Sequence, residues 1–172
     1  MYDIHHFFTP LLDEFTEFDN NNWYLSPVVT LAAAKELRDL HRLPKTIENL
    51  NVSFEILEKI SKDFLIINLH GRKYGRKFLI ELQNRLAVLT ILDYNDGLRQ
   101  EIIEVLGLAR TDFLVHQNFA QQQLIEATRD FYKNGFVQAP ASLVYTGREC
   151  LKFDSCSQRI IQNYLSHIEK TA

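Results

Sequence analysis

The stretch FLIINLHGRKYGRKFLIELQNRLAVLTILD, residues 64–93, decides the expected fold. Two long apolar runs, rich in Ile, Leu, Phe and Val, flank a short basic segment that holds Gly71 and Gly75. Glycine tolerates the positive φ angles that hairpin turns need, and branched and aromatic side chains favour strands. The stretch therefore predicts an antiparallel three-stranded meander with strands over 64–70, 76–83 and 86–92.

A helix is the alternative for the second half of this stretch. Leu79, Leu82, Leu86 and Leu89 also recur at helical spacing, so the pattern leaves open one helix across 78–92. Around the meander, capping residues and apolar spacing predict helices over 10–18, 26–43, 47–62, 98–107, 112–135 and 160–168. A second, short hairpin is expected over 141–145 and 150–153. The expected fold class is α+β: N-terminal helices, the meander, two helices, the hairpin and a C-terminal helix.

Length and composition favour one domain over residues 1–172. The chain has 46 % hydrophobic residues, enough for one well-buried core. Its longest apolar runs are far shorter than the roughly 20 residues that a membrane span needs. The N-terminus MYDIHHFF lacks the basic start of a secretory signal, so we expect a cytoplasmic protein with no membrane partner.

The first eight residues form an expected apolar arm. It precedes a helix start at Thr9-Pro10 and must bury its side chains on its own domain or on a partner. The candidate interface residues are Tyr2, Ile4, Phe7 and Phe8. The arm therefore predicts self-association or contact with a protein partner.

A basic cluster surrounds the expected turn at residues 70–77. Its candidate residues for binding an anion or a partner are His70, Arg72, Lys73, Tyr74, Arg76 and Lys77. Such a cluster could hold phosphates while the tyrosine stacks on a base. Hairpin tips are also commonly charged for solubility, and the formal net charge of the chain is −3. Nucleic acid is thus a possible partner but not the favoured one.

No complete catalytic, metal or nucleotide motif stands in the sequence. The cysteines, Cys150 and Cys156, lack the C-x-x-C spacing of zinc and redox sites. The histidines lack metal-ligand spacing, and the glycines spell no phosphate loop. We therefore expect no metal and no cofactor, and we assign no catalytic residue. An active site would have to be assembled from residues that are distant in sequence.

Two C-terminal segments carry a family resemblance. Thr146-Gly-Arg-Glu-Cys-Leu151 resembles the opening of the helix-turn-helix of LuxR-type regulators, and residues 157–170 resemble its recognition helix. The resemblance covers residues 146–171 and implies that Arg159, Gln162 and Asn163 face the major groove of DNA. About 15 residues of the intervening helix are absent, so the implied DNA-binding part is degenerate.

These observations favour binding over turnover. The sequence predicts a regulatory or adaptor domain that binds a protein partner or a second copy of itself. A LuxR-type transcription regulator and a small enzyme with a dispersed site are the alternatives. We expect an apolar groove or a two-fold patch for an adaptor and a deep pocket with convergent polar groups for an enzyme.

Overall fold

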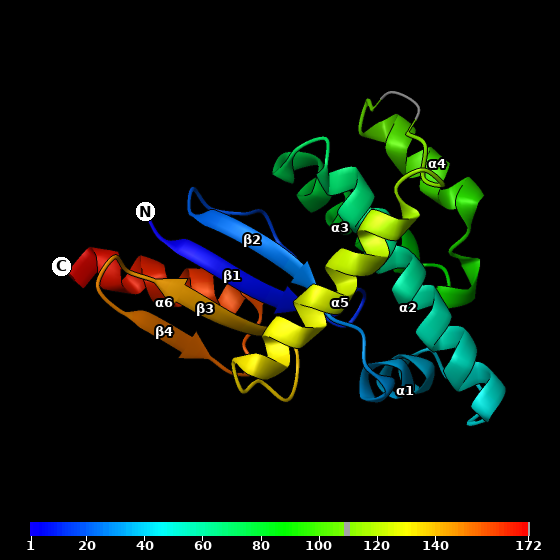
Figure 1. Cartoon of the computed structure of the whole chain (residues 1–172), viewed down its shortest axis with the longest axis horizontal. Coiled ribbons are helices and arrows are strands. Elements are labelled where there is room, and N and C mark those ends of the chain that lie inside the picture. Colours follow the sequence, from blue (N-terminus) through cyan, green and yellow to red (C-terminus); the bar gives the residue numbers. More distant parts are fainter. Residues whose placement is uncertain (109–110, 172) are drawn as a thin grey trace.

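The computed structural model describes residues 1–108 and 111–171 and has an α+β fold (Figure 1). The strands are β1 (Asp3–Phe8), β2 (Asn22–Pro27), β3 (Ala141–Tyr145) and β4 (Cys150–Phe153). Five helices lie between β2 and β3: α1 (Leu31–Leu40), α2 (Ile47–Asn68), α3 (Arg72–Leu86), α4 (Asp96–Val105) and α5 (Gln117–Lys133). The helix α6 (Gln158–Thr171) closes the described chain, and a 3-10 turn, Ile91–Asp93, precedes α4.

The strands form one mixed sheet in the order β2-β1-β3-β4. β1 pairs in parallel with β2, with Ile4 opposite Trp23, and antiparallel with β3, with Ile4 opposite Val144. The segment that the sequence suggested as an arm is thus an inner strand of the sheet. Helices α1, α2 and α4 lie beyond the ends of β1 and β2, whereas α3 begins beside β2 (Figure 1).

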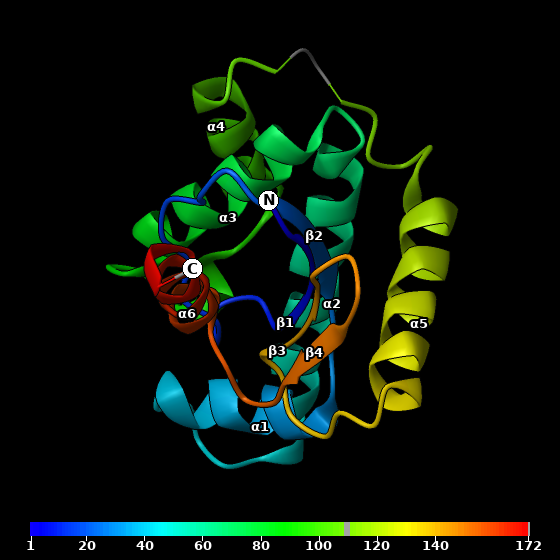
Figure 2. The same cartoon turned by 90° about the vertical axis from the view of Figure 1, so that its left-hand side faces the viewer.

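Helices cover both faces of the sheet. On one face, Ile161 and Leu165 of α6 pack against Ile4, Trp23 and Val144. On the opposite face, the end of α5 brings Phe131 against Phe7 and Leu143. Figure 2 shows α6 and α5 on opposite sides of the strands. Within the described residues, no helix is both long enough and apolar enough to cross a membrane.

The predicted three-stranded meander is wrong. Residues 64–70 fall at the end of α2 and in the turn after it, and 72–86 form α3, so the helical alternative for 78–92 was closer. Phe64, Ile66 and Ile67 are fully buried because α2 packs against several neighbours, and a helix buried on several sides reads as a continuous apolar run. Gly71 adopts φ +132° at the start of α3 rather than in a hairpin turn.

The predicted helix over 10–18 is also absent, because this segment is the crossover that joins the parallel strands β1 and β2. Its backbone groups bond to side chains of distant helices. Gln83 of α3 both accepts from the Phe15 N–H (2.8 Å) and donates to the Phe15 carbonyl (3.1 Å). Gln158 of α6 accepts from the Thr16 N–H (2.9 Å). These tertiary partners override the local helix signals.

The C-terminal part matches the sequence analysis more closely. The hairpin over 141–145 and 150–153 is confirmed residue for residue, and a helix follows it. The strands could be predicted because a turn residue separates them. Gly147 lies in this turn and adopts φ +85°. The Ala139–Pro140 peptide that leads into β3 is cis.

The contact between α2 and α3 depends on Gly75. A Cβ at this position would overlap the Asn68 side chain and would come within 2.9 Å of the Phe64 ring. We therefore expect Gly75→Ala to lower the free energy of unfolding by about 1–3 kcal/mol, although alanine favours helices. Urea unfolding measures this change. Adding Asn68→Ala should recover part of the loss, and a Gly75→Ala variant as stable as the wild type would contradict the tight contact.

Candidate functional site

A buried chain of hydrogen bonds lies at the end of β1. His6 Nε2 is 2.6 Å from Asp13 Oδ2, and His6 Nδ1 is 2.6 Å from Ser142 Oγ. With the ring proton on Nε2, the imidazole donates to the carboxylate and accepts from the serine hydroxyl. The three residues come from β1, the crossover segment and β3, so this chain of bonds ties the crossover to the centre of the sheet.

A serine, a histidine and an aspartate in contact also suggest acyl-transfer chemistry, in which serine is the nucleophile. Here His6 and Ser142 have no exposed surface and Asp13 is only 4 % exposed. The rings of Phe15 and Trp23 meet the imidazole edge-on and close the space around it. No substrate atom can reach the serine oxygen in this arrangement, so the three residues form a structural connection.

The loop directly after β1 has the sequence Thr9-Pro10-Leu11-Leu12. The Thr9 hydroxyl donates to the Val28 carbonyl (2.8 Å), and the Val28 N–H donates to the Phe8 carbonyl (2.8 Å). A cavity of about 80 Å³ adjoins this loop, lined in part by Thr9, Val28 and Ala139. Small-molecule sites typically occupy about 300–1,000 Å³, so this cavity is too small for most substrates.

The thiols lie elsewhere and apart from each other. Cys150 begins β4 and is exposed, whereas Cys156 follows the end of β4 and is half-buried. Both are free, and the Cys156 thiol donates to the Asp154 carbonyl at 3.2 Å. Dithiol exchange within this chain therefore has no adjacent cysteine pair to use. Among the described residues, no group of three or more His, Cys, Asp or Glu side chains could hold a metal ion.

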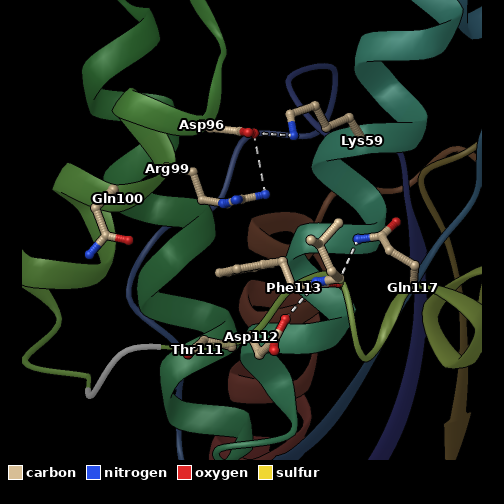
Figure 3. A pocket seen from close by; sticks show the side chains of 9 residues that line it. Lys59, Asp96, Arg99, Gln100, Thr111, Asp112, Phe113 and Gln117 are labelled. Atoms are coloured by element: carbon tan, nitrogen blue, oxygen red, sulfur yellow. Dashed lines mark hydrogen bonds and ion pairs between the residues drawn. The ribbon is translucent and has the colours of Figure 1, made fainter.

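A cavity of about 840 Å³ lies among α2, α4 and the segment before α5 (Figure 3). Next to the cavity lies Asp63, which is 1 % exposed. Its carboxylate accepts hydrogen bonds from the Tyr94 hydroxyl (2.8 Å) and from Arg99 Nη1 (3.0 Å). The Lys59 ammonium donates to Asp96 at 2.6 Å, and the Arg99 guanidinium lies 3.7 Å from the centre of the Phe113 ring. Both cations of the cavity are thus already paired with carboxylates.

Burial controls the titration of this cluster. It raises the pKa of the Asp63 carboxyl above its ordinary value, against the opposing effect of Arg99. Burial, followed by the charge of Asp63, raises the pKa of the Tyr94 hydroxyl well above its usual range. The hydrogen bond from Lys59 lowers the pKa of Asp96. An anion entering the cavity would compete with Asp96 for its cations, so the cluster holds α2, α4 and Tyr94 together rather than presenting free charge.

The basic cluster predicted as a hairpin tip lies around the start of α3. The Arg72 guanidinium stacks over Tyr24 at 4.6 Å, and Arg76 stacks over Phe18 at 4.9 Å. Arg76 also donates to the Trp23 carbonyl at the edge of β2 (3.2 Å), and burial lowers its pKa.

The other members of the cluster share no single surface role. Lys73 and Lys77 are exposed, Tyr74 packs against the core, and His70 contacts Thr111 (3.1 Å). Arg72 and Arg76, two of the four permanent cations, therefore already contact aromatic rings of their own chain. Binding of polyanions by the whole cluster stays a prediction.

The candidate interface residues at the N-terminus lie in or beside β1. Ile4 and Phe8 are fully buried, Phe7 is 4 % exposed, and Tyr2 packs against the cluster beneath α6. These side chains are occupied by the core of their own chain.

The segments that resemble a helix-turn-helix form a turn, β4 and α6. Residues 146–149 make the β3–β4 turn, Cys150 and Leu151 lie in β4, and Arg159 and Asn163 are exposed on α6. The helix α6 packs its apolar face, with Ile161 and Leu165, on the core of the chain. A strand thus stands where the first helix of the motif is expected.

A shallow apolar groove runs between α2 and α5. It encloses about 190 Å³ and is lined chiefly by Val29, Phe54, Glu58, Leu124, Ile125 and Thr128. Ile125 is 44 % exposed. Glu58 is the one charged side chain among the lining residues, and it forms no ion pair within the described parts of the chain. The groove therefore offers apolar contact beside one negative charge.

Sequence reasoning missed most of these groups. The sequence analysis assigned no role to His6. His5 and His6 are adjacent in β1, so their side chains point to opposite faces of the sheet. Once β1 is recognised as a strand, this alternation would place His6 in the core. Nothing local marks Asp13 and Ser142 as its partners, because the contact with Ser142 spans 136 positions.

No protein-family model matches the sequence, and no curated protein sequence matches it. The fold resembles that of a solved structure from Nitrosomonas europaea, described as a "putative protein disulfide isomerase". The TM-score is 0.64 and the identity 12 %, and the match covers 99 % of this chain and 98 % of the other. At this identity the likeness shows a shared fold alone.

The Asp63 cluster gives stability a defined pH dependence. Because its pKa is raised from 3.8, the folded chain binds this proton more tightly than the unfolded chain. The contribution of Asp63 to the free energy of unfolding therefore falls as pH rises above about 4. Tyr94→Phe removes a hydrogen bond to the ionised carboxylate and should destabilise the protein by about 2 kcal/mol at pH 7.

The effect of Tyr94→Phe should shrink at pH 4, where more of Asp63 is protonated. Urea unfolding at both pH values measures it. The matched control is Tyr132→Phe on α5, whose side chain is 54 % exposed and should show no change. Equal effects of Tyr94→Phe and Tyr132→Phe would contradict the role of this hydrogen bond.

Proposed function

We propose that this chain is a regulatory or adaptor protein that binds a protein partner and performs no thiol exchange. The observation that carries the proposal is the loop after β1. The fold resembles that of the protein described as a "putative protein disulfide isomerase". Thioredoxin-like redox proteins use a C-x-x-C motif near a βαβ unit. Here residues 9–12 contain no cysteine, and buried hydrogen bonds from His6 and Thr9 hold the segment in place.

The remaining polar groups support binding rather than turnover. The large cavity has paired cations, and the serine next to His6 is sealed from solvent. What stays available is apolar surface, of which the groove between α2 and α5 is the most defined. We propose that this groove accepts an apolar side chain of the partner while a neighbouring lysine or arginine of the partner pairs with Glu58.

The catalytic part of the proposal is tested by thiol-disulfide exchange. The purified protein should reduce insulin with dithiothreitol no faster than its Cys150→Ser/Cys156→Ser variant, and neither should exceed the rate without protein. Exchange needs a reactive thiolate next to a resolving thiol, and these two thiols lie apart. Activity above background that depends on either cysteine would overturn the proposal.

The binding part is tested with a photocrosslinking residue at Val29, on the wall of the groove. In native cells this chain should form a discrete protein adduct. Ile125→Asp and Glu58→Lys should each reduce adduct formation by about tenfold, since a central interface residue typically contributes more than 1 kcal/mol. Val88→Asp, at a residue 86 % exposed after α3, is the matched control and should leave the adduct intact. Adducts that form equally in all variants would contradict binding in the groove.

A further inference from the structure

The two edges of the sheet differ in how they are covered. At the β2 edge, Arg76 of α3 donates to the Trp23 carbonyl and Arg72 stacks over Tyr24. β4 forms the other edge, and no element lies beyond it in Figure 1. An uncovered edge strand is a template for pairing with another strand.

The pairing of β3 with β4 identifies which backbone groups are free. The Thr146 N–H donates to the Glu149 carbonyl, and the register places Val144 opposite Leu151 and Ser142 opposite Phe153. Hydrogen-bonded pairs alternate along an antiparallel ladder, so Leu151 and Phe153 bond inward to β3. The N–H and C=O groups of Cys150 and Lys152 therefore point out of the sheet edge.

We propose that β4 pairs antiparallel with β4 of a second copy of this chain, in the register that places Leu151 opposite Leu151 of the other copy. Cys150 of each copy then exchanges backbone hydrogen bonds with Lys152 of the other. The two-fold axis stands perpendicular to the sheet, so both α6 helices lie on the same face and the two sheets become one.

Charge selects this register among the three that pair the free groups. With Leu151 opposite Leu151, the turn residue Arg148 of each copy lies opposite Asp154 of the other copy. This pair occurs at both ends of the paired segment. A shift in one direction places Lys152 opposite Arg148, and a shift in the other places Lys152 opposite Lys152. Like charges directly opposite each other destabilise strand pairs. Arg148 and Asp154 are exposed and form no ion pair within residues 1–108 and 111–171.

Apolar side chains next to the edge would be covered by the same contact. Phe153 meets Tyr164 of α6 with ring centres 5.3 Å apart, which places Tyr164 on the β4 side of this helix. Tyr164 is 44 % exposed and Ile160, one turn earlier, is 53 % exposed. Both belong to the face of α6 that borders the open edge. The edge thus combines free backbone groups, apolar flanks and self-complementary charges.

Sedimentation of the purified chain tests this pairing, which does not depend on the proposed groove or on any partner. For so short a strand we expect a dimer with a Kd of about 10–100 µM. Lys152→Pro removes an outward N–H that β3 does not use, so it should weaken the dimer by about tenfold or more while the fold persists. Thermal unfolding checks the fold of this variant.

A charge swap tests the register. Arg148→Asp and Asp154→Arg should each weaken the dimer by about tenfold, and the double variant should restore it. A monomer at millimolar concentration, or a dimer that none of these variants changes, would overturn the proposal.

Crosslinking gives an independent test of the same register. Cα atoms of a pair without mutual hydrogen bonds lie about 4.5 Å apart, within the range that a disulfide spans. Leu151→Cys in a Cys150→Ser/Cys156→Ser chain should therefore form an intermolecular disulfide under mild oxidation. Cys150 of the native chain should not crosslink to its copy, because it lies diagonally displaced by about 7–8 Å. Efficient crosslinking through native Cys150, with none through residue 151, would contradict this register.

Discussion

The hydrogen-bonded chain of Asp13, His6 and Ser142 is the interaction on which the rest of the sheet depends. His6 and Ser142 are fully buried and Asp13 is almost fully buried, so their polar groups need partners inside the protein. The two hydrogen bonds pair both ring nitrogens of His6 with Ser142 Oγ and Asp13 Oδ2, while Asp13 Oδ1 is buried with no hydrogen-bond partner among the described residues. By bonding the crossover to β1 and β3 at once, it fixes the connection that allows β1 and β2 to run parallel. Removing one partner would leave the others buried and unsatisfied, which costs more than the bond itself contributes.

The same interaction holds the segment that follows β1. Residues 9–12 of this segment contain no cysteine, and the Thr9 hydroxyl donates to the Val28 carbonyl. Helices α1–α5 lie between β2 and β3 in the chain, and the Asp63 cluster joins α2 to α4. We therefore propose that the chain works through its surfaces: the groove between α2 and α5 for a partner and the β4 edge for a second copy.

The sequence predicted the α+β class, the hairpin of β3 and β4 and a helix at the C-terminal end, because turn residues and apolar spacing are local signals. It failed where tertiary contacts decide. Residues 64–70 were predicted as a strand because the end of α2 is buried on several sides and reads as a continuous apolar run. Residues 10–18 were predicted as a helix because a local pattern does not show their contacts with Gln83 and Gln158. The candidate site could not be predicted for the same reason, because Ser142 lies 136 positions from His6 in the sequence. The groove escaped notice because Glu58 and Ile125 lie on separate helices.

The central claim is that the groups at the end of β1 form a closed structural connection rather than a reaction centre. Nuclear magnetic resonance of the histidine side chains tests it most directly. If the claim is correct, the ring N–H that bonds Asp13 gives a signal that exchanges slowly with water, while the exposed ring of His167 exchanges fast. Asp13→Asn should alter the His6 signal alone. A His6 ring proton that exchanges as rapidly as that of His167 would show an open site and contradict the account.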